Sequence, residues 1–206
     1  MQNLLLELFD DCLSRAYREA ENGASWDIKR QGDGLTVYFQ KSNGVVDWLN
    51  NLDLFSTPYR EMSPVWHCHA GFLRVWKSVV DLIKPFILDP LVNEITFVGY
   101  SHGSALYVLC LEFAYYHRPD LRKRVFGVGF GCPRVLYGCV PPDIALRWEH
   151  FFVVRNLDDL VTHLPPSALG YCHVGNLIEI GKSGRYSQVD AHRPENYRRE
   201  LVNLSK

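Results

Sequence analysis

Residues 94–114 read EITFVGYSHGSALYVLCLEFA. The apolar run from Glu94 to Val98 is typical of a buried β-strand. The next five residues, 99–103, have the small residues of a tight turn, and the apolar residues beyond them recur at helical spacing up to Pro119. A strand, a tight turn and a helix in this order predict one unit of a parallel sheet with a helix packed on its face.

The chain on either side of this unit continues the alternation of strands and helices. We predict a helix over 1–20, a hairpin over 26–39 that turns at 32–34, a short helix over 45–52, irregular chain around Pro58 and Pro64, a helix over 72–83 closed by Pro85, strands over 125–130, 151–154 and 177–180, and a closing helix around 197–201. Such alternation predicts the α/β class, with a mostly parallel central sheet flanked by helices, in a compact single domain over 1–206.

Composition narrows the class of partner. The chain has 206 residues, of which 47% are hydrophobic, so it can bury one substantial core. Its 22 basic and 23 acidic residues form no block of like charge, which argues against nucleic-acid binding. We therefore expect a small-molecule partner and no cofactor. No apolar run is long enough to predict a transmembrane segment, and residues 1–20 lack the cationic start of a secretory signal, so we expect a cytoplasmic protein.

The cysteines give no sign of a metal or disulfide framework. Cys68 lies between His67 and His69, but this spacing lacks the paired ligands of a zinc site, and we expect no metal. We expect all six cysteines to be free and buried; they are Cys12, Cys68, Cys110, Cys132, Cys139 and Cys172.

The turn at 99–103 matches G-x-S-x-G, in which a serine is exposed on a strained strand-to-helix turn. Glycines on either side remove side chains that would collide there. This motif predicts that Ser101 is a nucleophile. A serine hydroxyl needs a histidine to take its proton and a carboxylate to orient that histidine. The alternative interpretation is a small residue in an ordinary turn, which would not explain an exposed hydroxyl between glycines.

The partners of Ser101 should follow it in the order carboxylate, then histidine. The strand predicted over 151–154 leads to Asp158 and Asp159, and the histidines after them are His163, His173 and His192. Because these groups meet only in the fold, spacing alone leaves both carboxylates and all three histidines open.

Several blocks of the chain resemble the class 3 lipase family, which includes the fungal triacylglycerol lipases, over residues 35–201. The blocks are Phe39-Gln40-Lys41-Ser42 with Asp47-Trp48-Leu49, His69-Ala70-Gly71-Phe72, Phe130-Gly131-Cys132-Pro133-Arg134-Val135, residues 155–161 with Leu164-Pro165-Pro166, and Asp190-Ala191-His192 with Tyr197. The resemblance implies an α/β-hydrolase fold. It also implies that Asp159, two residues before Val161, is the triad acid and that His192 is the base.

The resemblance implies further roles. The oxyanion hole would consist of the backbone N–H groups of His102 and Ser42, although Gln40 and Lys41 depart from the family's usual Arg-Gly. We expect Trp48, Tyr100 and Leu160 to contact the substrate; His163 and His173 resemble the family's structural or pocket-lining histidines.

Residues 43–54 follow Ser42 at the position of the amphipathic lid of the fungal relatives. A lid would imply transient contact with a lipid interface, whereas the same pattern also suits an ordinary surface helix. The hypothesis is hydrolysis of acylglycerols or similar lipid esters. The alternatives are an esterase for short-chain or feruloyl esters, and a non-catalytic binding module on a hydrolase fold.

Overall fold

The computed structural model describes residues 2–20, 23–41, 54–62, 65–139 and 142–204. A mostly parallel sheet runs through its centre in the order β1-β2-β3-β6-β7-β9-β11. Its strands are β1 (Arg18–Glu19), β2 (Ala24–Gln31), β3 (Gly34–Lys41), β6 (Glu94–Tyr100), β7 (Val125–Phe130), β9 (Phe151–Asn156) and β11 (Asn176–Ile180). The strands from β3 to β11 are mutually parallel, and β1 and β2 extend the sheet antiparallel.

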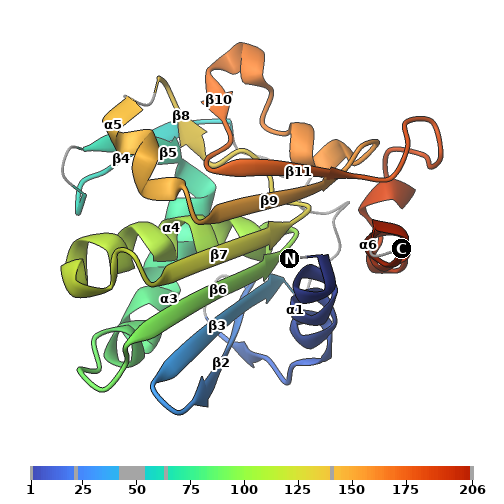
Figure 1. Cartoon of the computed structure of the whole chain (residues 1–206). Coiled ribbons are helices and arrows are strands. Elements are labelled where there is room, and N and C mark those ends of the chain that lie inside the picture. The colour runs from blue at the N-terminus through green and yellow to red at the C-terminus, as the bar shows by residue number, and fades with distance from the viewer. Residues whose placement is uncertain (1, 21–22, 42–53, 63–64, 140–141, 205–206) are drawn as a thin grey trace.

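Helices cover both faces of this sheet (Figure 1). The helices of the described chain are α1 (Gln2–Ser14), α3 (Ala70–Ile87), α4 (His102–His117), the short α5 (Pro142–Ala145) and α6 (Pro194–Leu204). Helices α3 and α4 lie on one face, and α1 and α6 pack against each other on the opposite face. This arrangement is an α/β-hydrolase fold, as expected from the sequence.

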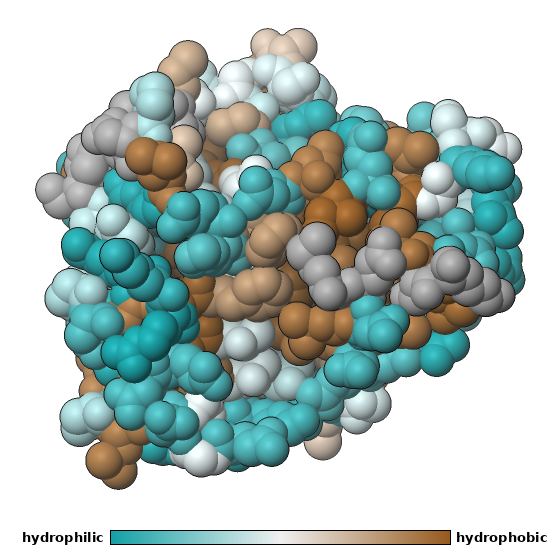
Figure 2. All heavy atoms as spheres, in the orientation of Figure 1, coloured by the Kyte–Doolittle hydropathy of each residue, from teal (hydrophilic) through white to brown (hydrophobic). Residues whose placement is uncertain are grey.

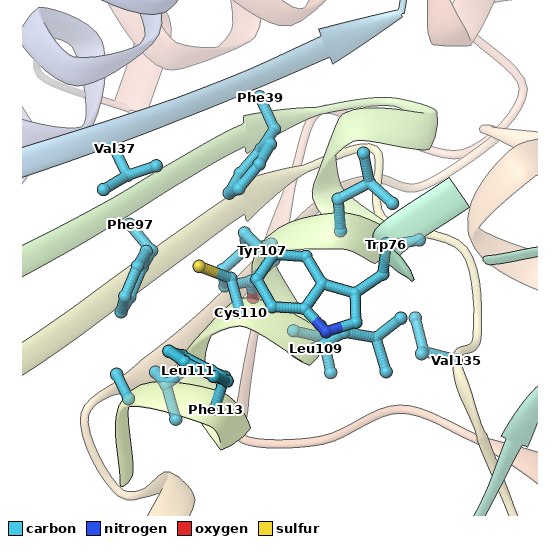
Figure 3. Packing of buried hydrophobic residues seen from close by; sticks show 14 of the residues in the cluster. Val37, Phe39, Trp76, Phe97, Tyr107, Leu109, Cys110, Leu111, Phe113 and Val135 are labelled. Atoms are coloured by element: carbon cyan, nitrogen blue, oxygen red, sulfur yellow. The ribbon is translucent and has the colours of Figure 1, made fainter. Parts of the chain in front are cut away.

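Each face of the sheet has its own apolar core. Figure 3 shows the larger one, where Phe39 and Phe97 of the sheet face Trp76 of α3 and Phe113 of α4. The smaller core lies under α1 and α6 and centres on Phe9. Figure 2 shows the surface in the orientation of Figure 1, with apolar residues gathered toward its middle. The sheet is thus held from both sides, which fixes the carboxyl ends of its parallel strands.

A second sheet, not predicted from the sequence, has the order β10-β8-β5-β4. Its strands are β4 (Ser56–Tyr59), β5 (Trp66–His69), β8 (Leu136–Tyr137) and β10 (Tyr171–Cys172). The chain around Pro58, expected to be irregular, therefore forms an edge strand, where a proline is tolerated because one side of the strand has no partner strand.

Two helix boundaries also differ from the prediction. Helix α1 ends at Ser14, so the helix predicted over 1–20 is too long, and Ala16 is exposed in the link to β1. Helix α3 continues past Pro85 to Ile87, because a proline in the last turn removes only a bond near the helix end, and the Leu88 N–H still donates to the Lys84 carbonyl at 2.9 Å. None of the described helices is long and apolar enough to cross a membrane.

Short 3-10 turns complete the described chain: η2 (Pro119–Leu121), η3 (Leu146–Trp148), η4 (Leu160–His163), η5 (Ser167–Leu169) and η6 (Asp190–His192). Two of them, η4 and η6, follow the carboxyl end of the sheet and contact each other. They bring together residues that are far apart in the sequence.

Candidate active site

Ser101 lies on the turn between β6 and α4 in a strained conformation. Its φ of 57° and ψ of −131° make it the one non-glycine with positive φ in the part of the chain that the structure describes. Such a conformation is costly for a side chain and persists where the surroundings enforce it. Here the Ser101 N–H donates to the Phe130 carbonyl at 2.8 Å, and the Ser101 carbonyl accepts from the Ser104 N–H at 2.9 Å.

The two glycines of the motif permit close backbone packing. A Cβ on Gly99 would lie 2.7 Å from the Cα of Ser104, and one on Gly103 would lie 2.3 Å from the carbonyl oxygen of Phe39. Both distances are far below normal contact, so only glycine lets β6 turn this sharply and lets α4 begin against β3. The sequence motif thus has the structural context that it requires.

Three side chains form a hydrogen-bonded line at the carboxyl edge of the sheet. The His192 Nε2 lies 2.7 Å from the Ser101 Oγ, and the His192 Nδ1 lies 2.8 Å from the Asp159 Oδ2. Asp159 follows β9, and His192 is the last residue of η6. With a proton on Nδ1, the imidazole donates to the carboxylate and accepts the serine proton on Nε2, which is the arrangement that activates a serine hydroxyl.

The Asp159 carboxylate is fully buried and accepts two more hydrogen bonds. The Val161 N–H donates to Oδ1 at 2.9 Å, and the Tyr197 hydroxyl donates to Oδ2 at 2.6 Å. Burial, and then the neighbouring Asp159 charge, raise the pKa of Tyr197 well above its usual range, so this hydroxyl stays a donor. Donors from three directions offset the cost of burying the carboxylate.

A second set of contacts holds His192. The Tyr100 hydroxyl donates to the His192 carbonyl, and the two rings stack with centroids 5.4 Å apart. The Asn156 side-chain amide donates to the Ala191 carbonyl at 2.9 Å. Gly131, with a φ of 62°, lies so close that a Cβ there would be 2.8 Å from the His192 Cε1. The ring is therefore fixed in position on several sides.

Tyr100 supports His192 from the core that lies under α1 and α6. It is 5% exposed and packs in the core that contains Phe9. The expected substrate contact stays a prediction for Tyr100, and likewise for Leu160, which is half-buried in η4 directly after Asp159.

Of the two residues expected to form the oxyanion hole, the structure describes His102. It is the first residue of α4, where N–H groups have no partner within the helix and the helix dipole favours negative charge. Its ring is buried against Phe72. Ser42, Trp48 and residues 43–53 of the expected lid lie outside the described residues.

The alternatives left open by the sequence have other partners. The Asp158 carboxylate accepts from the N–H groups of Gly184 and Arg185 at 3.0 and 3.1 Å, and the Gly184 bond is the main cause of its lowered pKa. His173 bonds through Nε2 to the Thr162 carbonyl at 2.8 Å, and burial lowers its pKa to about 4. His163 is exposed, although burial of part of its ring lowers its pKa.

The histidines around Cys68 are accounted for by the fold. His69 caps α3, because its Nδ1 accepts from the Phe72 N–H at 3.3 Å, while His67 is exposed on β5. Among the described residues, no group of three or more His, Cys, Asp or Glu side chains is placed to hold a metal ion.

Sequence reasoning gave no role to two residues that contact the site, Tyr197 and Gly131. Tyr197 lies five residues after His192 in the block that resembles the family's late motif, and Gly131 lies in the Phe130–Val135 block. The family blocks therefore pointed to both residues, but the contact of Tyr197 with Asp159 and the close approach of Gly131 to His192 arise only in the folded chain.

The hydrogen-bonded line has the geometry of a Ser-His-Asp triad, and it lies on an α/β-hydrolase fold. The family model described as Lipase (class 3) matches residues 36–169, and the chain belongs to this family. It is 26% identical over 155 residues to the lipase of Rhizomucor miehei. This match covers 72% of this chain and 42% of that protein.

Solved structures show the same fold. The lipase of Rhizopus microsporus var. chinensis superposes with a TM-score of 0.67 at 24% identity, covering 79% of this chain and 59% of that one. A triacylglycerol lipase whose catalytic centre is described as a serine protease triad superposes with a TM-score of 0.66 at 22% identity, covering 81% of this chain and 66% of that one. The chain thus spans less than half of the curated relative and about three fifths of the first structure.

Proposed function

We propose that this protein hydrolyses lipid esters of the acylglycerol type through an acyl-enzyme on Ser101. The observation that carries the proposal is the line from Ser101 through His192 to the buried Asp159. Membership of the class 3 lipase family supports the choice of a lipid ester.

The geometry supports a two-stage mechanism. The Ser101 Oγ attacks the ester carbonyl carbon while the His192 Nε2 takes its proton, and the resulting oxyanion faces the N-terminus of α4. His192 then returns the proton to the leaving alcohol, which departs and leaves the acyl group on Ser101. Water, deprotonated by His192, hydrolyses this acyl-enzyme and frees the serine. Throughout, Asp159 holds the imidazole and stabilises its charged form.

The first test compares hydrolysis of tributyrin emulsion with that of nitrophenyl butyrate and nitrophenyl laurate. The wild type should hydrolyse the emulsion and laurate, and Ser101→Ala should lose all three activities while keeping the circular dichroism spectrum of the wild type. Activity on butyrate alone would reject a lipase in favour of a short-chain esterase. Activity in folded Ser101→Ala would reject the serine mechanism.

Exposed apolar side chains support contact with a lipid interface. Leu54 is 46% exposed and Phe55 is 77% exposed, beside the start of α3, where the Phe55 carbonyl accepts from the Ala70 N–H at 2.9 Å. Phe72 in the first turn of α3 contacts the His102 ring next to Ser101. The backbone at Phe55 is thus bound to the helix that contacts the candidate site, and contact of the exposed Leu54 and Phe55 side chains with lipid would favour access of an insoluble ester.

A pair of matched variants tests this contact. Phe55→Ser should weaken activity on emulsion and leave nitrophenyl butyrate hydrolysis unchanged. The control is Leu91→Ser, because Leu91 is 69% exposed but precedes β6, at the edge of the sheet opposite Ser101. Equal loss of emulsion activity in both variants, or in neither, would contradict a lipid contact at Phe55.

A further inference from the structure

Two cysteines meet at the edge of the second sheet, outside the candidate active site. All six cysteines are free, and four of them are buried; these are Cys12, Cys68, Cys110 and Cys132. Cys139, by contrast, is exposed and Cys172 is half-buried, so the sequence-based expectation of burial is wrong for both. They belong to the part of the molecule formed by β8 and β10, which Figure 1 shows beyond β11 and away from α1 and α6.

The backbone brings the two cysteines together. Strand β8 pairs antiparallel with β10, and the pairing continues one step further, where the Gly138 N–H donates to the Gly170 carbonyl at 2.9 Å. The chain then turns at Gly138, whose φ is 95°, and Cys139 and Cys172 line the same depression of the surface. A φ in this range suits glycine and fixes the direction of the residue that follows.

The side chains are within reach of each other. The Cys172 Sγ lies 3.6 Å from the Gly138 carbonyl oxygen. In a trans peptide this oxygen is about 2.8 Å from the next Cα, so standard geometry places the Cys172 sulfur within about 6.5 Å of the Cys139 Cα. At this distance the Cys172 sulfur is within reach of the Cys139 side chain once the Cys139 rotamer changes and the exposed bend shifts, and a disulfide then requires the two Cα atoms to lie about 4.4 to 6.8 Å apart.

Both thiols also line one open depression of about 720 Å³. Its lining also includes Leu146, Trp148 and His173. An opening of this size admits a small peptide disulfide to Cys139 and Cys172, whereas the four buried thiols are shielded from such a reagent.

We propose that Cys139 and Cys172 form a reversible dithiol pair, closed to an intramolecular disulfide by exchange with a small-molecule disulfide of the glutathione type. The Cys139 thiolate attacks one sulfur of oxidised glutathione, breaks its S–S bond and releases one reduced glutathione. Cys172 then loses its proton to solvent, and its thiolate attacks the Cys139 sulfur and releases the second glutathione. The two cysteines are oxidised and one glutathione disulfide is reduced to two thiols.

The exposure of the two thiols explains why Cys139 reacts before Cys172. Cys139 is exposed and is therefore the thiol that the reagent meets first. Burial, and then the neighbouring Cys139 thiolate, raise the pKa of Cys172, so this thiol reacts when the mixed disulfide is already formed beside it.

Non-reducing peptide mapping of the folded wild type after incubation with oxidised glutathione tests the proposal. The expected product is a cross-link between the peptides that contain Cys139 and Cys172, with the other four cysteines still open to alkylation after unfolding. Dithiothreitol should reverse the link.

Two single variants check the order of the steps. Cys172→Ser should accumulate a stable glutathione adduct on Cys139, whereas Cys139→Ser should react much more slowly. A glutathione adduct that persists on Cys139 of the wild type, a link to a different cysteine, or no reaction at either thiol would overturn the proposal, and none of these readouts depends on ester hydrolysis.

Discussion

At the scale of single residues, two adjacent carboxylates at the end of β9 have opposite environments. Asp159 is fully buried and contacts His192, whereas Asp158 accepts hydrogen bonds from a surface loop. The resemblance to the family selected Asp159, but the spacing of the chain did not. The reason is that the contact joins residues 33 positions apart, and the contact between His192 and Ser101 spans 91 positions.

This pair allows a matched test of the triad acid. Asp159→Asn should lower kcat about 10⁴-fold, because an amide cannot hold the imidazole in the required tautomer. Asp158→Asn should leave kcat within a few-fold of the wild type. The measurement is the initial rate of nitrophenyl butyrate hydrolysis with both variants shown to be folded. A larger loss in Asp158→Asn would exclude the assignment of the acid to Asp159.

Gly131 offers a second residue-scale test. Gly131→Ala should lower kcat strongly because its Cβ would lie 2.8 Å from the His192 Cε1 and would push the ring away from Ser101. Gly32→Ala is the control: Gly32 has the same φ of 62°, but a Cβ there would meet no other atom within 4 Å. Both variants share the backbone strain of about 1 to 2 kcal/mol, and only Gly131→Ala should lose activity. Equal kcat values at equal stability would show that Gly131 does not position His192.

At the scale of elements, α4 begins directly after Ser101 and also carries a buried carboxyl group, that of Glu112. Its first thirteen residues, 102–114, are all buried, as is typical of a helix that packs on every side. Glu112 on this helix is 0% exposed, and its carboxylate accepts from the Arg147 guanidinium at 3.0 Å and from the Trp148 indole N–H. Burial is the main cause that raises the pKa of Glu112 to about 7.

This pKa predicts a pH-dependent stability. The folded protein binds the Glu112 proton more tightly than the unfolded chain, whose carboxyl has its ordinary pKa of 4.5. The stabilisation that the protonated Glu112 carboxyl contributes is therefore fully present below pH 4.5. It is lost as the pH rises toward about 7, and the free energy of unfolding falls by about 3 kcal/mol at most. Glu112→Gln should remove this loss. Thermal unfolding from pH 5 to pH 8 should show the wild type falling relative to the variant, and parallel curves would contradict the raised pKa.

The elements also show where sequence patterns stop being informative. Strands β6, β7, β9 and β11 and helices α3, α4 and α6 were predicted because their apolar residues recur over at least one full period. Strands β8 and β10 have two residues each, which is too short for an alternating pattern. The helix over 1–20 was predicted too long because Ala16 and Ala20 continue the spacing of its apolar face, although α1 ends at Ser14.

At the scale of the whole molecule, the sheet brings the site together from segments that span half of the chain. The carboxyl ends of β6, β7 and β9 deliver Ser101, Gly131 and Asp159, and the core under α1 and α6 supports Tyr100 and Tyr197. The sequence predicted this layout because parallel buried strands place their carboxyl ends at one edge. It gave no role to Tyr197, because a hydroxyl bonded to a buried carboxylate leaves no periodic pattern in the sequence.

The most direct test of the central claim is covalent labelling with a fluorophosphonate, followed by peptide mapping. The folded wild type should bind one equivalent on Ser101, His192→Ala should be labelled far more slowly, and unfolded protein should not react. Labelling of another residue, or no labelling of the folded wild type, would contradict the account of Ser101 as an activated nucleophile.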